Sequence, residues 1–252
     1  MPDDLRARCA IAVMAKAPKP GRVKTRLCPP LLAEEAMALS AAFLRDITEN
    51  IREAARAAPI DGWVAYAPAG DAHAFDGHLA PGTRLLLADG GIEAPAAVQG
   101  FGRSMLHAMR DLLARGYGGA AVLNADSPTL PTARLVETAQ ALLEGGDRAV
   151  FGAAEDGGYY LLGLRQAHSR PFEDVAWSTD VVADQTRARV AELGLPMLEL
   201  APWYDVDNAA ALARLLRELA DPTPTADAPY RAASTAACVA RLGLPVRLQA
   251  AA

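Results

Sequence analysis

The sequence predicts an α/β fold, a three-layer and doubly wound, mostly parallel sheet. Short apolar runs alternate with segments whose apolar residues recur every three or four positions, which is typical of strands alternating with helices. Charged or glycine-rich segments follow several of these runs, as expected where loops leave the carboxyl ends of parallel strands. The chain has 252 residues, 52% of them hydrophobic and 22% charged, enough to bury a sizeable core.

The first strand is predicted over residues 9–15, and a basic loop over residues 16–26 follows it directly. Five cations in one short loop repel one another unless an anion joins them. Backbone N–H groups and basic side chains at the end of a buried strand hold phosphate in α/β proteins. The loop therefore predicts a nucleotide phosphate site. Helical spacing from Leu32 to Ile51 then predicts a long amphipathic helix that starts after Pro29 and Pro30.

The remaining elements continue the alternation. Strands are predicted at residues 63–67, 84–88, 120–124, 149–151 and 197–200, and helices at 104–113, about 132–143 and 211–216. A single domain is predicted over residues 8–220, with a linker and a helical tail over 221–252. Residues 232–242 are compatible with a small helix, which would either pack back on the domain or mediate self-association. A frayed tail is the alternative.

Asp126 follows the most hydrophobic strand after the first, and Pro128 stops that strand. Its carboxylate should therefore project into the crevice that holds the basic loop. One aspartate there suits Mg²⁺ or Mn²⁺, which complete their coordination with phosphate oxygens and water. Asp126 or Ser127 could equally cap the helix that follows. From spacing alone, the two interpretations are even.

Two further acidic segments stand at element ends. Glu155 and Asp156 precede paired glycines, a pattern that suits a general base or the binding of hydroxyls beside a close backbone approach. Asp-Gly is also a strong signal for an ordinary hairpin turn. Asp205 and Asp207 follow a predicted strand and precede a helix. Here N-capping by Asp207 or Asn208 is the competing interpretation.

Composition excludes several classes of function. A net charge of −5 and a pI of about 5.4 argue against an extended nucleic-acid surface, which needs many cations together. The three cysteines are scattered and signal neither a disulfide framework nor a zinc site. The N-terminus does not have the pattern of a signal peptide, and no run reaches membrane-spanning length, so a cytoplasmic location away from membranes is expected.

Several strings in one order, from about Ile11 to Leu216, resemble the DUF2064 family of the glycosyltransferase A (GT-A) superfamily, also described as selenodomain-associated or arsenosugar-biosynthesis transferases. These strings are Ala15-Lys16-Ala17-Pro18, Gly21-Arg22-Val23-Lys24-Thr25-Arg26-Leu27, Gln99-Gly100-Phe101-Gly102-Arg103, Ala125-Asp126-Ser127-Pro128, Glu155-Asp156-Gly157-Gly158-Tyr159-Tyr160, Trp177-Ser178-Thr179 and Asp205-Val206-Asp207. The resemblance implies a nucleotide-diphospho-sugar transferase fold and a divalent metal, Mg²⁺ or Mn²⁺, at Asp126. It implies a second ligand at Asp207, with Asp205 as the near competitor.

The expected site residues follow from the loops and the resemblance together. The catalytic candidates are Lys24, Arg26, Glu155 and Asp156. The nucleotide-binding candidates are Ala15, Lys16, Ala17, Gly21, Arg22, Lys24, Arg26, Gln99, Gly100 and Asp126. The substrate-binding candidates are Gly157, Gly158, Tyr159, Trp177, Ser178 and Thr179.

Two chemistries share the implied fold. A glycosyltransferase would stabilise a departing nucleoside diphosphate while an acceptor hydroxyl attacks the sugar carbon. A nucleotidyltransferase of guanylyl or cytidylyl type would clamp a triphosphate while a phosphorylated small molecule attacks, releasing pyrophosphate. The Lys24-Thr25-Arg26-Leu27 string also resembles the loop of phospholactate guanylyltransferases. Family resemblance favours glycosyl transfer from a nucleotide-sugar donor to a small-molecule acceptor. A non-catalytic nucleotide-binding protein and a homo-oligomeric state remain open.

Overall fold

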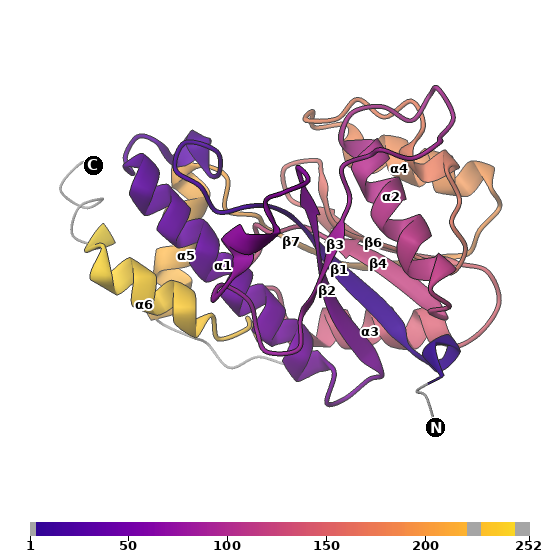
Figure 1. Cartoon of the computed structure of the whole chain (residues 1–252), viewed down its shortest axis with the longest axis horizontal. Helices are drawn as coiled ribbons and strands as arrows, with labels where there is room; N and C mark the ends of the chain where they lie inside the picture. The colour runs from indigo at the N-terminus through magenta and orange to yellow at the C-terminus, as the bar shows by residue number, and fades with distance from the viewer. Residues whose placement is uncertain (1–3, 221–227, 245–252) are drawn as a thin grey trace.

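The computed structural model describes residues 4–220 and 228–244, and its centre is a seven-stranded sheet (Figure 1). The strand order is β3-β2-β1-β4-β6-β5-β7, and only β6 runs antiparallel to its neighbours. The strands are β1 (Cys9–Lys16), β2 (Ile60–Ala67), β3 (Arg84–Leu87), β4 (Gly119–Leu123), β5 (Ala149–Ala154), β6 (Tyr159–Leu164) and β7 (Met197–Trp203). The predicted mostly parallel α/β sheet is confirmed.

Helices cover both faces of the sheet (Figure 1). One face packs against α1 (Ala33–Ala54) and α3 (Thr132–Leu143), with α5 (Ala209–Ala220) and α6 (Ala233–Arg241) in the same hydrophobic core. The other face packs against α2 (Phe101–Ala114) and α4 (Val182–Glu192). Short 3-10 helices are η1 (Leu5–Ala7), η2 (Thr25–Leu27), η3 (Ala72–Phe75) and η4 (Arg170–Phe172). The three layers are those expected from the sequence.

Strand β1 shows why its sequence is apolar throughout. Ile11 and Val13 point into the core on the α1 face, whereas Ala10 and Ala12 point into the core on the α2 face. A strand covered on both faces reads as a continuous hydrophobic run.

Within the described residues, no helix is both long enough and apolar enough to cross a membrane.

The order of the strands places a ligand crevice at one edge of the sheet. From β1 the chain builds outward through β2 and β3, and it then returns to add β4 on the other side of β1. Ligands of open α/β sheets bind beyond the carboxyl ends of the strands at such a reversal. The basic loop follows β1, and Asp126 follows β4. The fold therefore brings these two sequence signals to one crevice.

Several details differ from the sequence expectations. Strand β6 had not been predicted as a strand. Helix α4 had not been predicted, because its residues are mostly polar and only four of them are buried. Strand β2 begins at Ile60, three residues before the predicted start at Trp63. Between β5 and β6 the chain makes a tight turn at Glu155–Gly158, which confirms the hairpin interpretation of that Asp-Gly segment.

Helix α6 packs against α1 and contributes Cys238 and Val239 to the core. Its attachment is polar as well, because the buried Asp46 of α1 accepts hydrogen bonds from the backbone N–H groups of Ser234 and Thr235, at 2.9 and 2.6 Å. These N–H groups lie in the first turn of α6, where no carbonyl of the helix is placed to accept a hydrogen bond from them. Residues 233–241 therefore form a helix that packs back against α1. The domain boundary at residue 220 stays a prediction, and the linker residues 221–227 lie outside the described residues.

We expect Asp46→Ala to lower the free energy of unfolding by about 2–3 kcal/mol, because two N–H groups lose a charged acceptor in a buried place. Urea unfolding measures the loss, and hydrogen exchange should show α6 opening first. Glu49→Gln, on the same helix but in ion pairs with Arg45 and Arg52, is the control and should change stability by less than about 1 kcal/mol. Equal effects of the two substitutions would show that Asp46 does not hold α6.

Candidate functional site

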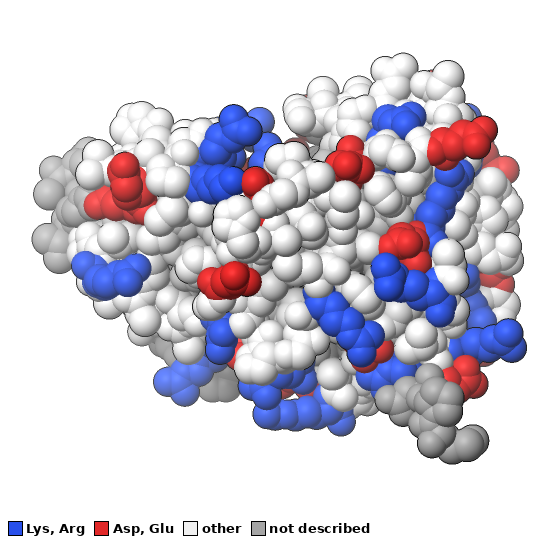
Figure 2. All heavy atoms as spheres, viewed as in Figure 1, with Lys and Arg blue, Asp and Glu red and all other residues white. Residues whose placement is uncertain are grey.

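The basic loop after β1 lines a cavity of about 960 Å³, which we call the donor cavity. The expected nucleotide-binding residues Ala15, Lys16, Ala17, Gly21, Arg22, Lys24, Arg26 and Asp126 all lie in its wall. The ends of β2 and β3 contribute Tyr66, Pro68 and Ala88. Figure 2 shows Lys and Arg side chains gathered beside a hollow at the top of the view, on the side of α1. A local anion site on an acidic protein is what the sequence predicts.

Lys24 does not extend freely into this cavity. Its ammonium contacts Asp126 Oδ1 at 2.5 Å and Asp207 Oδ1 at 2.9 Å, and it donates a hydrogen bond to the carbonyl oxygen of Val206 at 2.8 Å. The side chain is only 4% exposed and passes over the ring of Phe43 in α1. Lys24 is therefore the cation on which the acids that follow β4 and β7 converge.

The charge of Lys24 is secured by these acids. Burial alone would lower the pKa of Lys24, but the carboxylates of Asp126 and Asp207 outweigh burial and raise that pKa above its ordinary value. The backbone of Lys24 is left-handed, with φ of 50°. Such a conformation costs a non-glycine residue on the order of 1 kcal/mol and persists only where surrounding contacts enforce it. Here the three oxygens around the ammonium provide those contacts.

Asp126 and Asp207 lie close together because the segments after β4 and β7 are joined. The Val206 N–H donates to the carbonyl oxygen of Asp126 at 2.9 Å, and the buried Ser127 hydroxyl donates to the carbonyl oxygen of Tyr204 at 2.9 Å. Helix α3 begins only at Thr132, so neither Asp126 nor Ser127 caps it.

At the start of α5, the cap is Asn208, whose side-chain oxygen accepts from the N–H of Ala211 at 2.9 Å. Capping therefore explains Asn208 and leaves the carboxylate of Asp207 directed at Lys24. Asp205 does not line the donor cavity. Burial, together with the nearby carboxylates of Asp156, Asp207 and Asp126, raises the pKa of Asp205 to about 7. Asp207, rather than Asp205, is the acid that shares the Lys24 cation with Asp126.

Asp126 after β4 and Asp207 after β7 suit a divalent cation that needs only two carboxylates from the protein. Within the described part of the chain, no group of three or more His, Cys, Asp or Glu side chains is arranged as a metal site. Asp126 and Asp207 nevertheless converge on one cation, the Lys24 ammonium. Two carboxylates suit Mg²⁺, which keeps waters and takes phosphate oxygens as further ligands. The donor set fits a metal that arrives with, or is completed by, a bound phosphate.

A second cavity of about 470 Å³, which we call the acceptor cavity, adjoins the first. The two share Met14, Arg26, Phe101, Ala125, Asp126, Trp177, Ser178 and Asp207 in their walls. Five of the six expected substrate-binding residues lie in the wall of the acceptor cavity, and two of them are also in the wall of the donor cavity. These five are Gly158, Tyr159, Trp177, Ser178 and Thr179. Asp126 and Asp207 therefore stand where the two cavities meet.

Trp177 owes its position to a glycine in α2. A Cβ added at Gly102 would lie 2.8 Å from the Trp177 ring and 3.1 Å from the carbonyl oxygen of Phe172. The glycine-rich string at residues 99–103 thus makes room for an aromatic side chain. Gln99 and Gly100, expected to bind nucleotide, lie outside both cavity walls. Gln99 instead donates to the Ala96 carbonyl oxygen, and Gly100 precedes the first residue of α2.

We expect Gly102→Ala to displace the Trp177 ring, to shift its fluorescence emission and to destabilise the protein by about 1–3 kcal/mol through overpacking. The double substitution Gly102→Ala with Trp177→Phe provides the control, because the smaller ring leaves space for the added methyl group. Recovery of stability in the double variant is the expected result. If the two substitutions were additive, Gly102 would not act through Trp177.

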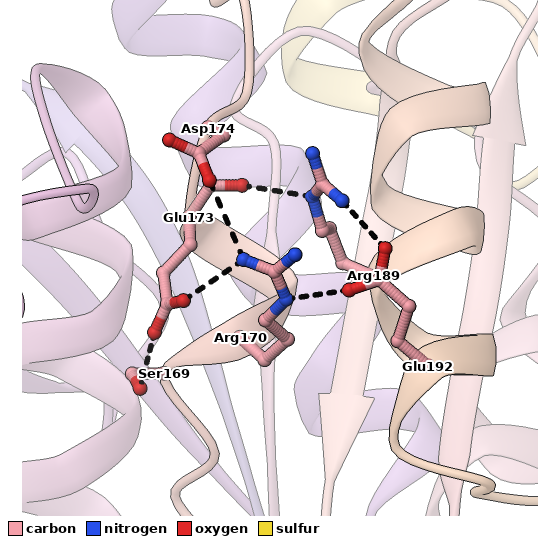
Figure 3. A network of polar contacts seen from close by, with 6 residues as sticks. All are labelled: Ser169, Arg170, Glu173, Asp174, Arg189 and Glu192. Carbon is pink, nitrogen blue, oxygen red and sulfur yellow. Dashed lines mark hydrogen bonds and ion pairs between the residues drawn. The ribbon is translucent and has the colours of Figure 1, made fainter.

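The segment that carries Trp177 is braced by a network of ion pairs between η4 and α4 (Figure 3). Arg170 binds Glu192 at 2.6 Å and Glu173 at 3.0 Å, and Arg189 binds the same Glu192 at 2.5 Å. Asp174, which follows Glu173 in the chain, donates its backbone N–H to the carbonyl oxygen of Ala97. These contacts fix the chain just before it enters the acceptor cavity at Trp177.

Glu155 is not brought to either cavity. Its carboxylate pairs with Arg214 of α5 at 2.6 Å, whereas Asp156, its neighbour in the turn, lines the acceptor cavity. Of the two proposed bases, only Asp156 is therefore in position. Gly157 likewise lies outside the wall, and its close backbone approach is to Asp180 rather than to an open space.

Sequence reasoning missed Phe101 and Asp180, which both line the acceptor cavity. Phe101 is 51% exposed, unusual for a large apolar side chain, and stands between two glycines. The two flanking glycines were the feature of the sequence that could have pointed to Phe101. Asp180 directly follows the Trp177-Ser178-Thr179 string, and only the fold shows that its segment faces the β5–β6 turn.

Comparisons with known proteins agree with this architecture. A crystal structure of a candidate nucleotide-diphospho-sugar transferase from Desulfovibrio desulfuricans G20 is 26% identical, with a TM-score of 0.79 over 96% of this chain and 97% of that one. CMP:2-keto-3-deoxy-manno-octonic acid synthetase, solved with CTP, is 12% identical, with a TM-score of 0.53 over 84% of this chain and 98% of that one. A nucleotidyl transferase from Methanothermobacter is 14% identical, with a TM-score of 0.50 over 82% and 94%. The last two show the fold alone.

No curated protein sequence matches the chain. The model of the family described as "Uncharacterized protein conserved in bacteria (DUF2064)" matches residues 50–179, just over half of the 252 residues. The matched part contains Asp126, Asp156 and the Trp177 segment of the site. The chain therefore belongs to the DUF2064 family.

Proposed function

We propose that the protein is a metal-dependent glycosyltransferase. It binds a nucleotide-diphospho-sugar in the donor cavity and passes the sugar to a small molecule in the acceptor cavity. The observation that carries this proposal is the convergence of Asp126 and Asp207 on one cation where the two cavities meet. A diphosphate lying there would be bordered by the basic loop on one side and by the acceptor on the other.

The basic loop would bind the diphosphate. Lys16, Arg22 and Arg26 are exposed in the wall of the donor cavity and are free to move onto phosphate oxygens. Lys24 would balance the charge of Asp126 and Asp207, so that the acids do not repel the incoming diphosphate. A Mg²⁺ or Mn²⁺ ion held by these acids would supply further neutralisation of the charge that grows on the leaving nucleoside diphosphate.

Asp156 would act as the base. As the acceptor hydroxyl oxygen bonds to the sugar carbon, its proton passes to the Asp156 carboxylate. The bond between that carbon and the phosphate oxygen breaks, and the nucleoside diphosphate leaves with the electron pair. The exposed Asp156 carboxylate lies in the acceptor cavity, on the side where the hydroxyl must sit.

Nucleotidyl transfer is the second candidate, supported by the resemblance of Lys24-Thr25-Arg26-Leu27 to phospholactate guanylyltransferases. In that reaction the basic loop would clamp a triphosphate, and a phosphorylated acceptor would attack the α-phosphorus with release of pyrophosphate. The two reactions leave different products, which makes them easy to separate.

The test is a product assay on the purified protein with panels of nucleotide-sugars and nucleoside triphosphates. The proposal expects slow hydrolysis of a nucleotide-sugar even without acceptor, with nucleoside diphosphate accumulating and Asp156→Asn lowering the rate by about 10²-fold or more. Pyrophosphate release from a triphosphate and a phosphorylated small molecule, with no nucleoside diphosphate, would establish nucleotidyl transfer instead. Tight nucleotide binding without either product would indicate a non-catalytic protein.

A further inference from the structure

We propose that the acceptor cavity is built for a small molecule that carries no phosphate or carboxylate and that presents hydroxyl or ammonium donors beside an apolar face. This inference rests on the proposed function, because it assigns a chemical class to the acceptor of that reaction. It is carried by the charges, the hydrogen-bonding character and the aromatic wall of the cavity.

The charges in the wall are mostly negative. Four carboxylates line the acceptor cavity, and Arg26 is the only Lys or Arg among the described residues in its wall. Asp126 and Asp207 are balanced by Lys24, but Asp156 and Asp180 form no ion pair within the described residues. Arg26 itself lines both cavities and lies 3.9 Å from Asp207. An anionic acceptor would be repelled by these two unpaired carboxylates.

Two polar side chains of the wall, Asp156 and Thr179, call for hydrogen-bond donors on the ligand. An ionised carboxylate only accepts hydrogen bonds. Asp156 uses one oxygen to accept from the Gly158 N–H at 2.9 Å, and its other oxygen remains for a ligand. The Thr179 hydroxyl gives its proton to the carbonyl oxygen of Ala176 at 2.7 Å, so toward the cavity it too can only accept. Hydroxyl or ammonium groups satisfy such a wall.

Another part of the wall is aromatic. The rings of Phe101 and Trp177 meet edge to face at 6.1 Å, and those of Trp177 and Tyr159 at 6.4 Å. Met14 and Met105 complete this surface. Aromatic faces bind the apolar side of a ring-shaped polyol or attract a cation. A phosphorylated acceptor, which nucleotidyl transfer requires, matches neither part of the wall.

The test uses saturation-transfer NMR with the full chain and matched triplets of small probes. Each triplet holds a neutral polyol, its amino derivative and its phosphate, for example glucose, glucosamine and glucose 6-phosphate. Trp177 lines both cavities, so a signal that is lost in Trp177→Ala but kept in Lys16→Ala, a residue of the donor cavity alone, assigns binding to the acceptor cavity. We expect signals that depend on Trp177 for the neutral or amino members, with the phosphate members bound about tenfold more weakly.

A charge reversal sharpens the test. Asp180→Lys should strengthen binding of the phosphate members about tenfold, whereas Asp184→Lys, an exposed acid of α4 outside both cavities, should not. Phosphate members that bind wild-type protein as tightly as the neutral ones would overturn the inference, and so would a lack of any signal that depends on Trp177. Calorimetry with nucleoside diphosphate reports separately on the donor cavity. If nucleotide binding stays intact while either of these two results is found, the inferred class of acceptor is overturned and the proposed function is not.

Discussion

Replacing Asp126 with asparagine is expected to lower metal-dependent turnover by about 10³-fold, equivalent to about 4 kcal/mol of transition-state stabilisation. The substitution keeps the volume of the side chain but removes a charge from the place where Asp126 and Asp207 converge on Lys24. A divalent cation would then have one carboxylate instead of two. Turnover at several Mg²⁺ concentrations, with the melting temperature measured in parallel, provides the data.

The fold should survive this change, because Lys24 keeps Asp207 and the Val206 carbonyl oxygen as partners. Asp184→Asn is a matched control on an exposed acid that lines neither cavity, and it should behave as wild type. Turnover by Asp126→Asn that still responds to metal as the wild type does would refute the assignment of Asp126 as a ligand. Severe loss of stability with unchanged nucleotide binding would make its role structural.

Replacing Lys24 with methionine should lower both stability and nucleotide binding. Without the ammonium, Asp126 and Asp207 face each other, and only Arg26, 3.9 Å from Asp207, is left as a neighbouring cation. Because both carboxylates are about one-third exposed, we expect a loss of about 1–2 kcal/mol rather than the larger cost of breaking a fully buried pair. Affinity for nucleoside diphosphate without metal should fall by at least about tenfold, while affinity for the nucleoside alone changes little.

Added Mg²⁺ distinguishes this account from simple damage. If the metal occupies the place between the acids, it should raise the melting temperature of Lys24→Met more than that of the wild type, because it replaces the missing charge. Arg26→Ala is the matched control, since Arg26 is 70% exposed and its loss should weaken diphosphate binding without lowering stability. An identical Mg²⁺ response in wild type and Lys24→Met would contradict a shared cation site.

Much of the fold was predictable because strands β1 and β4 are covered on both faces and must therefore be apolar throughout. The position of the basic loop and of Asp126 followed from these strands and from the rule that ligands bind at strand ends. Helix α4 escaped prediction because its exposed, polar residues give little amphipathic periodicity. Periodicity reports burial, and a weakly buried helix leaves little of it.

The finer arrangement of the site depends on contacts between distant parts of the chain. Lys24 was expected to face phosphate, and nothing local signals that it pairs with Asp207, 183 residues away. Glu155 and Asp156 are neighbours in sequence, yet a tight turn directs one to Arg214 and the other to the acceptor cavity. Such choices of direction within a turn are set by the partners that tertiary structure supplies.

Titration calorimetry of nucleoside diphosphate binding, with and without Mg²⁺, tests the central claim most directly. The claim is that Asp126 and Asp207, placed beside the basic loop, form a phosphate site completed by a divalent cation. We predict that Mg²⁺ strengthens binding at least about tenfold in the wild type, and that Asp126→Asn removes this gain. Equal affinity with and without Mg²⁺ in the wild type, or a full Mg²⁺ effect retained by Asp126→Asn, would contradict the claim.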